Sequence, residues 1–219
     1  MSIKLYAHPF SSYCQKVLIA LYENDTPFEW QLLGPGAEHL AAEHAALWPF
    51  QRIPVLVDAG RTVVESTIII EYLGLEHPGP VRLVPGEPRA ALEVRMMDRF
   101  FDNYVMTPMQ KFVFDRLRAE ENRDPQGVAE ARAILDQAYR WLNDVLAGRE
   151  WAAGGDFSLA DCAAAPALFY ADWVHPIDEA FPAVRGYRRR LLARPSFARA
   201  VDEARPYRPF FPLGAPDRD

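Results

Sequence analysis

The order of secondary-structure signals along the chain is the feature that most constrains its fold. Residues 3–7 alternate between apolar and polar side chains, which predicts a strand, and residues 13–24 carry apolar side chains at the spacing of a helix face. Residues 28–33 predict a second strand. A strand, a helix and another strand in this order predict a parallel, right-handed βαβ unit.

The next segments complete a small sheet. The stretch up to residue 48 has the pattern of loop and weak helix. Residues 55–57 and 62–64 then flank a turn-rich spacer and predict an antiparallel hairpin, and a helix follows from residue 66 to about residue 75. The predicted order is therefore β-α-β-α-β-β-α.

The pattern changes after residue 77. Residues 78–88 are rich in proline and glycine, which interrupt regular structure, so this segment is predicted to be a linker. Residues 89–219 carry only helical signals, beginning with a long amphipathic helix over 89–121 that Pro108 should bend. We therefore expect an α/β N-terminal domain over residues 1–77, a linker over 78–88 and an all-α C-terminal bundle over 89–219.

Start signals divide the helical part further. Asp124 before Pro125 is a good N-cap followed by proline at the first helical position, and this helix should continue to about residue 147. Ser158 and Asp161 have the spacing of a capping box ahead of an apolar run. We also expect helices over 182–193 and 196–204, and a proline-rich tail from residue 206 without regular structure.

Composition narrows the function. The formal net charge of -6 offers no basic surface for nucleic acid or for an anionic membrane. The N-terminus lacks a secretory pattern and no apolar run approaches about 18 residues, which favours a cytoplasmic location. Cys14 and Cys162 lie far apart and outside ligand spacing, so we expect reduced thiols, no disulfide and no metal site.

Ser11 and Ser12 lie just before the first predicted helix. Unpaired backbone N–H groups and the helix dipole favour an anion there, and a serine hydroxyl adds one directed hydrogen bond. Such a site can stabilise a bound thiolate, since lowering a thiol pKa from about 8.5 to below neutral takes roughly 2.7 kcal/mol. The alternative is that both serines only cap the helix.

Two further motifs suit a peptide-like ligand. Pro54 lies at the mouth of a strand, where a cis bond would turn the backbone of Ile53 outward, whereas a trans bond would leave an ordinary strand start. Glu65 and Ser66 precede the next helix, whose N-terminus suits a carboxylate while Glu65 suits an ammonium group. Two helix N-termini would then face one ligand.

Taken together, these segments resemble the glutathione S-transferase superfamily over essentially the whole chain. The resemblance rests on SSYC, on PFQRIPVL with ES eleven residues after its second proline, on the proline-rich linker and on FSLAD. It implies a thioredoxin-like N-terminal domain and glutathione as the co-substrate. It also implies that Pro54 is cis, that the backbone of Ile53 pairs with the cysteinyl part of glutathione, and that Glu65 and Ser66 hold the γ-glutamyl end.

The resemblance extends to the other parts of the site. It places the thiolate-stabilising hydroxyl at Ser11, with Ser12 as the second choice. His39 and Arg52 lie where some classes of the family contact the glycyl carboxylate. An apolar electrophile pocket at the domain boundary has four candidates, although such residues are more often core: Phe10, Tyr13, Tyr104 and Met106.

Cys14 has two interpretations. A cysteine near a helix N-terminus can be an acidic nucleophile, as in the reductase branch of the family. Here Cys14 shares an apolar stripe with Val17, Leu18 and Leu21, so we expect a buried, inert thiol.

The expected function is therefore transfer of glutathione to a small hydrophobic electrophile, as in detoxification, by a homodimer that needs no metal. A glutathione-dependent isomerase, dehalogenase, peroxidase or disulfide reductase is the alternative on the same fold. A non-catalytic interaction protein that has lost the glutathione site is the alternative from another class. The presence of Ser11, Ile53-Pro54 and Glu65-Ser66 favours a glutathione binder.

Overall fold

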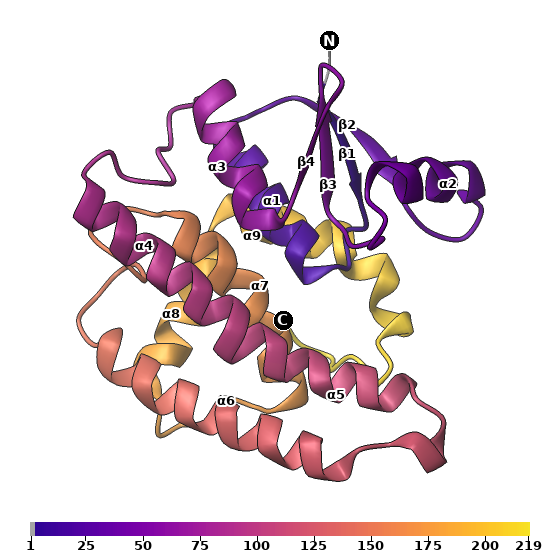
Figure 1. Cartoon of the computed structure of the whole chain (residues 1–219). Coiled ribbons are helices and arrows are strands. Elements are labelled where there is room, and N and C mark those ends of the chain that lie inside the picture. Colours follow the sequence, from indigo (N-terminus) through magenta and orange to yellow (C-terminus); the bar gives the residue numbers. More distant parts are fainter. Residues whose placement is uncertain (1–2) are drawn as a thin grey trace.

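The sheet of the N-terminal part forms in the predicted order (Figure 1). The computed structural model describes residues 3–219. Its strands lie in the order β2-β1-β3-β4, with β1 parallel to β2 and antiparallel to β3, and β3 antiparallel to β4. The elements of this part are β1 (Ile3–Ala7), α1 (Ser12–Glu23), β2 (Phe28–Leu32), α2 (Glu38–Leu47), β3 (Val55–Asp58), β4 (Arg61–Val64) and α3 (Ser66–Glu76).

The β3–β4 hairpin has the tight turn that its spacer predicts. Asp58 pairs with Arg61, so Ala59 and Gly60 alone form the turn. Both have positive φ angles, of 48° and 86°. Two consecutive positive φ angles are typical of the turn that matches the natural twist of a hairpin, and glycine adopts this conformation without steric cost.

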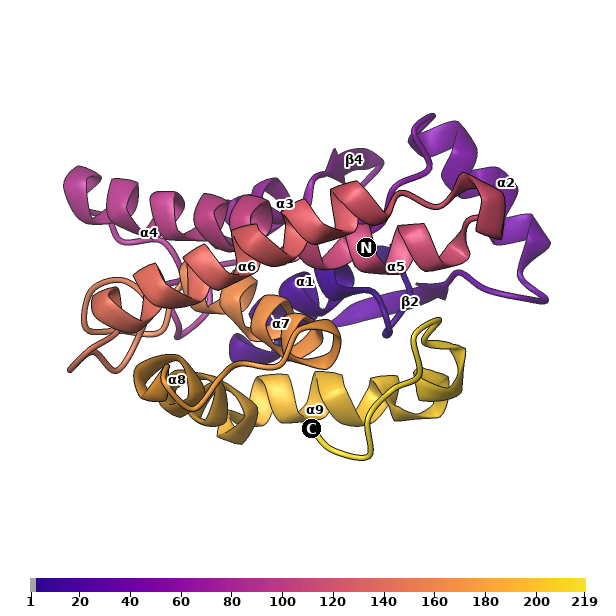
Figure 2. The same cartoon turned by 90° about the horizontal axis from the view of Figure 1, so that it is seen from below.

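The part after the linker is helical. Figure 2 shows α1 and α7 in the middle of the molecule, with α4, α5 and α6 on one side and α8 and α9 on the other. Nearly all of α7 is buried, which explains why its sequence is apolar all round. The α-helices are α4 (Pro88–Phe100), α5 (Thr107–Leu117), α6 (Pro125–Val145), α7 (Leu159–Val174), α8 (Pro182–Ala193) and α9 (Pro195–Ala204).

The first long helix differs from the prediction. Instead of one bent helix over 89–121, a π-helical segment, η1 (Phe101–Met106), separates α4 from α5, which ends at Leu117. Pro108 lies in the first turn of α5. Its ring cannot donate a backbone hydrogen bond and crowds the carbonyl of Tyr104, and the wider π turn accommodates both effects.

The C-terminal tail also differs from the prediction. A 3₁₀ helix, η3 (Arg205–Phe210), forms where we expected no regular structure. Pro206 lies at its start, where a missing N–H group costs nothing. A second short 3₁₀ turn, η2 (Glu120–Asn122), connects α5 to α6.

The predicted caps are present. The Asp124 side chain accepts a hydrogen bond from the Gly127 N–H at 2.9 Å. Asp161 accepts from the backbone and the hydroxyl of Ser158 at 2.9 and 3.0 Å, which completes the capping box of α7. Asp161 also accepts from the Tyr187 hydroxyl at 2.6 Å, so this cap ties α7 to α8.

Within residues 3–219, no helix is both long and apolar enough to span a membrane.

Candidate functional site

The N-termini of α1 and α3 open onto one cleft of about 440 Å³ between the sheet and the helical part. Seven of the predicted site residues line this cleft: Ser11, Tyr13, Arg52, Ile53, Pro54, Glu65 and Ser66. They come from three loops that are far apart in the sequence. The sheet brings them together because the ends of β1, β3 and β4 lie side by side.

Ser11 is the N-cap of α1 and also lines the cleft. Its hydroxyl accepts a hydrogen bond from the Cys14 N–H at 3.5 Å, which is long for such a bond. The cap is therefore weak, and the hydroxyl can still donate to a ligand in the cleft. Ser12 lies inside the first turn, is buried and does not line the cleft.

The Ile53–Pro54 peptide bond is cis, as the resemblance implies. The pairing of β3 begins at Val55, so Ile53 lies beyond the sheet register and at the edge of the cleft. The Arg52 carbonyl accepts a hydrogen bond from His44 Nε2 at 3.0 Å, which fixes this loop to α2.

Backbone strain marks both sides of the cleft. Glu65 and Gln51 have φ angles of 69° and 51°, although neither is glycine. Residues in this left-handed region cost free energy and cluster at ligand-binding sites.

The first-turn N–H groups of α3 have no partners within the helix, and the buried Ser66 hydroxyl lies beside them. The end of the cleft at the N-terminus of α3 therefore suits a carboxylate.

The opposite wall comes mainly from the helical part. It is polar and was not predicted from the sequence: Arg99, Asp102, Asn103 and Gln110, together with Trp48 and Gln51 from the loop before Pro54. Which face of α4 and α5 meets the sheet domain depends on tertiary packing. No local sequence signal identified these residues.

Tyr13 is the one predicted pocket residue that lines the cleft. Burial, followed by the nearby negative charge of Asp102, raises the pKa of its hydroxyl to about 12. Tyr13 therefore carries a neutral hydroxyl at physiological pH and offers a hydrogen bond without a charge.

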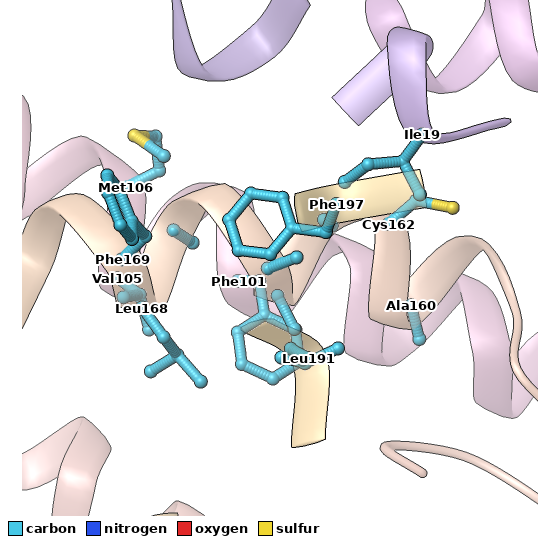
Figure 3. Close-up of a cluster of buried hydrophobic side chains, with 14 of the residues drawn as sticks. Ile19, Phe101, Val105, Met106, Ala160, Cys162, Leu168, Phe169, Leu191 and Phe197 are labelled. Carbon is cyan, nitrogen blue, oxygen red and sulfur yellow. The ribbon is translucent and has the colours of Figure 1, made fainter. Parts of the chain in front are cut away.

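The other three pocket candidates lie elsewhere. Phe10 packs against the rings of Tyr170 and Phe211, at centroid distances of 5.7 and 6.3 Å. Met106 is buried in the core cluster that Figure 3 shows. Tyr104 is 55% exposed on the outer face of the helices. The expected apolar pocket therefore does not form from these residues, because helical spacing does not reveal which side of a helix meets the cleft.

His39 also lies outside the cleft. Its side chain is exposed in the first turn of α2. Of the two residues expected near the glycyl carboxylate, only Arg52 lines the cleft.

The cysteines have the buried positions that the apolar pattern predicts. Cys14 is fully buried, and burial raises the pKa of its thiol to about 11. Cys162 lies in the hydrophobic cluster of Figure 3. Neither thiol lines the cleft. Among residues 3–219, no group of three or more histidine, cysteine, aspartate or glutamate side chains is arranged to hold a metal ion.

A larger cavity of about 570 Å³ lies between α1, α3 and the linker. It contains none of the predicted site residues and none of the strained residues. Convergent polar groups and strained backbone identify a functional site better than volume alone, so the smaller cleft is the candidate site.

Comparison with known proteins identifies the family of the chain. Residues 5–81 match the family model of the glutathione S-transferase N-terminal domain, and residues 125–190 match that of the C-terminal domain. A probable maleylacetoacetate isomerase of Vibrio cholerae is 29% identical over 94% of this chain and 98% of its own. A stringent starvation protein A homolog of Coxiella burnetii is 26% identical over 91% of each chain.

A solved structure with the same fold holds glutathione sulfonate. The glutathione S-transferase of Methylobacterium radiotolerans, in complex with glutathione sulfonate, is 30% identical, with a TM-score of 0.79 over 92% of this chain and 95% of its own. Both family models and this structure agree with the two-part architecture described above. The chain belongs to the glutathione S-transferase superfamily.

Proposed function

We propose that this protein binds glutathione in the cleft between α1 and α3 and transfers the intact tripeptide, through its sulfur, to a small electrophile. The observation that carries the proposal is the convergence of Ser11, the Ile53–Pro54 turn and the N-terminus of α3 on one cleft. A relative of solved structure holds a glutathione derivative. The convergence also argues against an interaction protein that has lost its ligand site.

Each part of the cleft matches a part of the tripeptide. The α-carboxylate of the γ-glutamyl residue suits the first-turn N–H groups of α3 and the Ser66 hydroxyl, and its ammonium group suits the Glu65 carboxylate. The backbone of Ile53 lies outside the sheet register and is placed to pair with the cysteinyl amide. The thiol would then lie toward Ser11.

Ser11 has the central role in this mechanism. Its hydroxyl donates a hydrogen bond to the sulfur and, with the positive end of the α1 dipole, favours the thiolate over the thiol. The thiol first gives its proton to water, and the thiolate then attacks an electrophilic carbon to form a sulfur–carbon bond. In a substitution, the electrons of the broken bond leave with the displaced group; in an addition, the electrons of the double bond take up a proton from water. Supplying an ionised sulfur in a fixed position is the main contribution of the protein.

A glutathione-dependent isomerase is the second candidate. Tyr13, Asn103 and Gln110 line the cleft and can hydrogen-bond to a polar substrate. The other three predicted pocket residues lie elsewhere: Phe10, Tyr104 and Met106. One relative is named a probable maleylacetoacetate isomerase. In this reaction the same thiolate adds reversibly to a double bond, so both candidates share the Ser11 site.

A homodimer is the proposed assembly. An apolar hollow of about 260 Å³ on the outer face of α4, η1 and α6 includes Met96, Phe100, Tyr104 and Trp141. Met96, Tyr104 and Trp141 are between 38% and 55% exposed in the single chain. Clustered exposed apolar side chains of this kind are typical of subunit interfaces.

Ultraviolet difference spectroscopy tests the proposed function directly. Adding glutathione to the protein at neutral pH should produce a thiolate absorbance band, and adding S-methylglutathione should not. A panel of activated aryl halides, epoxides and maleyl compounds then separates transfer from isomerisation by the product formed. Absence of the thiolate band at saturating glutathione would contradict both candidates.

A further inference from the structure

A buried lysine connects α1 to three other elements beneath the cleft. Lys16 lies on α1 and its side chain is only 1% exposed. Its Nζ atom lies 2.6 Å from Asp98 Oδ1 on α4, 2.8 Å from Asp102 Oδ2 on η1 and 2.9 Å from Thr67 Oγ1 on α3. One ammonium group therefore connects both helices whose N-termini open onto the cleft with the helices of the opposite wall.

The charges of this cluster balance. Arg99 adds a second cation and contacts both Asp98 and Asp102, so two cations face two carboxylates. Asp98 is fully buried and Asp102 nearly so. Arg99 is half exposed, but removing the other three charges from water is costly, and well-packed apolar side chains often give equal or greater stability. The network is therefore better explained by the geometry that it fixes than by stability alone.

The positions of the network residues show that the network fixes α1 relative to α3. Lys16 lies five residues after Ser11 on the same helix, and Thr67 directly follows Ser66. Arg99 and Asp102 themselves line the cleft. The network thus spans from the helix that carries the Ser11 hydroxyl to the helix that carries the Ser66 hydroxyl, and a ligand in the cleft bridges the same two helix N-termini.

We propose that Lys16 is a positioning residue that sets the distance between the Ser11 and Ser66 ends of the cleft. It does not touch the ligand, since its side chain is buried behind Asp102 and Thr67. It acts by holding α1, α3 and η1 in one arrangement that matches the length of glutathione. The inference rests on the proposed glutathione binding.

Two variants break the network at different points. Lys16→Met keeps the length of the side chain and removes its charge. Thr67→Val removes the one hydroxyl that connects Lys16 to α3 and leaves every charge in place. We expect glutathione affinity to fall about tenfold or more in Lys16→Met and about threefold in Thr67→Val, because small displacements of a binding group weaken binding strongly. Lys16→Arg, which restores the charge, should recover most of the affinity.

A readout at the sulfur separates positioning from general destabilisation. If the two ends of the cleft lose their spacing, a glutathione held at α3 no longer brings its sulfur to Ser11. The pKa of the bound thiol, measured from the pH dependence of the thiolate band, should therefore rise in Lys16→Met. Loss of stability alone would reduce the amount of folded protein without moving this pKa.

Glu23→Gln is the matched control. Glu23 lies at the other end of α1 and also forms an ion pair with the helical part, through Arg194 at 2.6 Å. It touches no residue of the cleft in the described structure. We expect a lower unfolding temperature for Glu23→Gln and unchanged affinity for glutathione.

The outcomes distinguish the two proposals. Wild-type protein that binds glutathione, with folded Lys16→Met and Thr67→Val variants that bind equally well, would overturn the role of Lys16 and leave the proposed function intact. Equal loss of affinity in Glu23→Gln would also overturn it. If Lys16→Met does not fold, Thr67→Val and Lys16→Arg decide the question. No binding by the wild type would overturn both proposals.

Discussion

Ser11 is the residue on which the proposed chemistry depends most. Replacing it with glycine removes the hydroxyl and costs the helix only a few tenths of a kcal/mol, because glycine is an acceptable N-cap. We expect the pKa of bound glutathione to rise by about two units and kcat/KM at neutral pH to fall about 100-fold, which corresponds to roughly 2.7 kcal/mol. Stopped-flow kinetics and thiolate absorbance measure both.

Ser12→Ala is the control for this change. Ser12 is buried in the first turn of α1 and does not line the cleft, so its loss should change kcat/KM less than twofold, on the order of ordinary variation. A large loss of thiolate in Ser12→Ala with little change in Ser11→Gly would assign the sulfur contact to Ser12 instead.

Cys14 and Cys162 should be unreactive in the folded protein. Both are fully buried, and burial raises the pKa of Cys14 to about 11, so almost no thiolate exists at neutral pH. An alkylating reagent followed by mass spectrometry should label neither cysteine in the native state and both after denaturation. Rapid labelling of native Cys14 would favour the disulfide-reductase alternative.

At this scale, the sequence predicted residues that share one cleft where their motifs have a fixed backbone context. Ser11, Pro54 and Ser66 each adjoin the start of a helix or strand, and the fold brings these starts to one cleft. It did not identify Arg99 or Asp102, because their contribution depends on how α4 faces the sheet. Lys16 was not identified either, because a lysine on a helix is usually solvated and only the packing of α1 shows that this one is buried.

At the scale of elements, the cap of α7 should dominate the stability of the helical part. Asp161 accepts hydrogen bonds from the Ala152 and Ser158 N–H groups and from the Tyr187 hydroxyl, all of them buried. Asp161→Ala leaves these donors without an acceptor, and we expect a loss of about 3 kcal/mol or more in the free energy of unfolding. Chemical denaturation followed by circular dichroism measures this loss.

Asp124→Ala provides the comparison. Asp124 caps α6 at the surface, so its replacement by alanine should lower the free energy of unfolding by only about 1 kcal/mol. Equal losses for the two variants would contradict the special role of the buried cap.

The elements themselves were largely predictable, because caps and apolar spacing are local. The π-helical segment η1 was not, since it reflects how the chain accommodates Pro108 within a packed bundle.

At the scale of the whole molecule, the outer face of α4, η1 and α6 should hold two copies together. Met96→Glu places a charge in the apolar hollow beside Phe100 and Trp141, and we expect it to convert a dimer to a monomer at micromolar concentration. Light scattering after size-exclusion chromatography gives the mass directly. Leu117→Glu, at an exposed apolar position outside this hollow, should leave the dimer intact. A wild-type monomer would contradict the assembly.

The two-part architecture followed from the order of elements, since an alternating βα segment and an all-helical segment pack differently. The domain boundary within residues 78–88 remains a prediction. The assembly and the electrophile could not be derived, because both depend on surfaces to which several elements contribute. The polar wall of Asn103 and Gln110 is an example, since α5 and η1 supply it jointly.

Isothermal titration with glutathione and with cysteinylglycine tests the central claim most directly. The two ligands differ only in the γ-glutamyl group, which the N-terminus of α3 is proposed to hold. We expect glutathione to bind one site per chain with a Kd between about 1 μM and a few mM, and cysteinylglycine to bind at least about tenfold more weakly. Ser66→Ala should remove most of this difference. No heat of binding with glutathione at about 10 mM, or equal affinity for both ligands, would contradict the account.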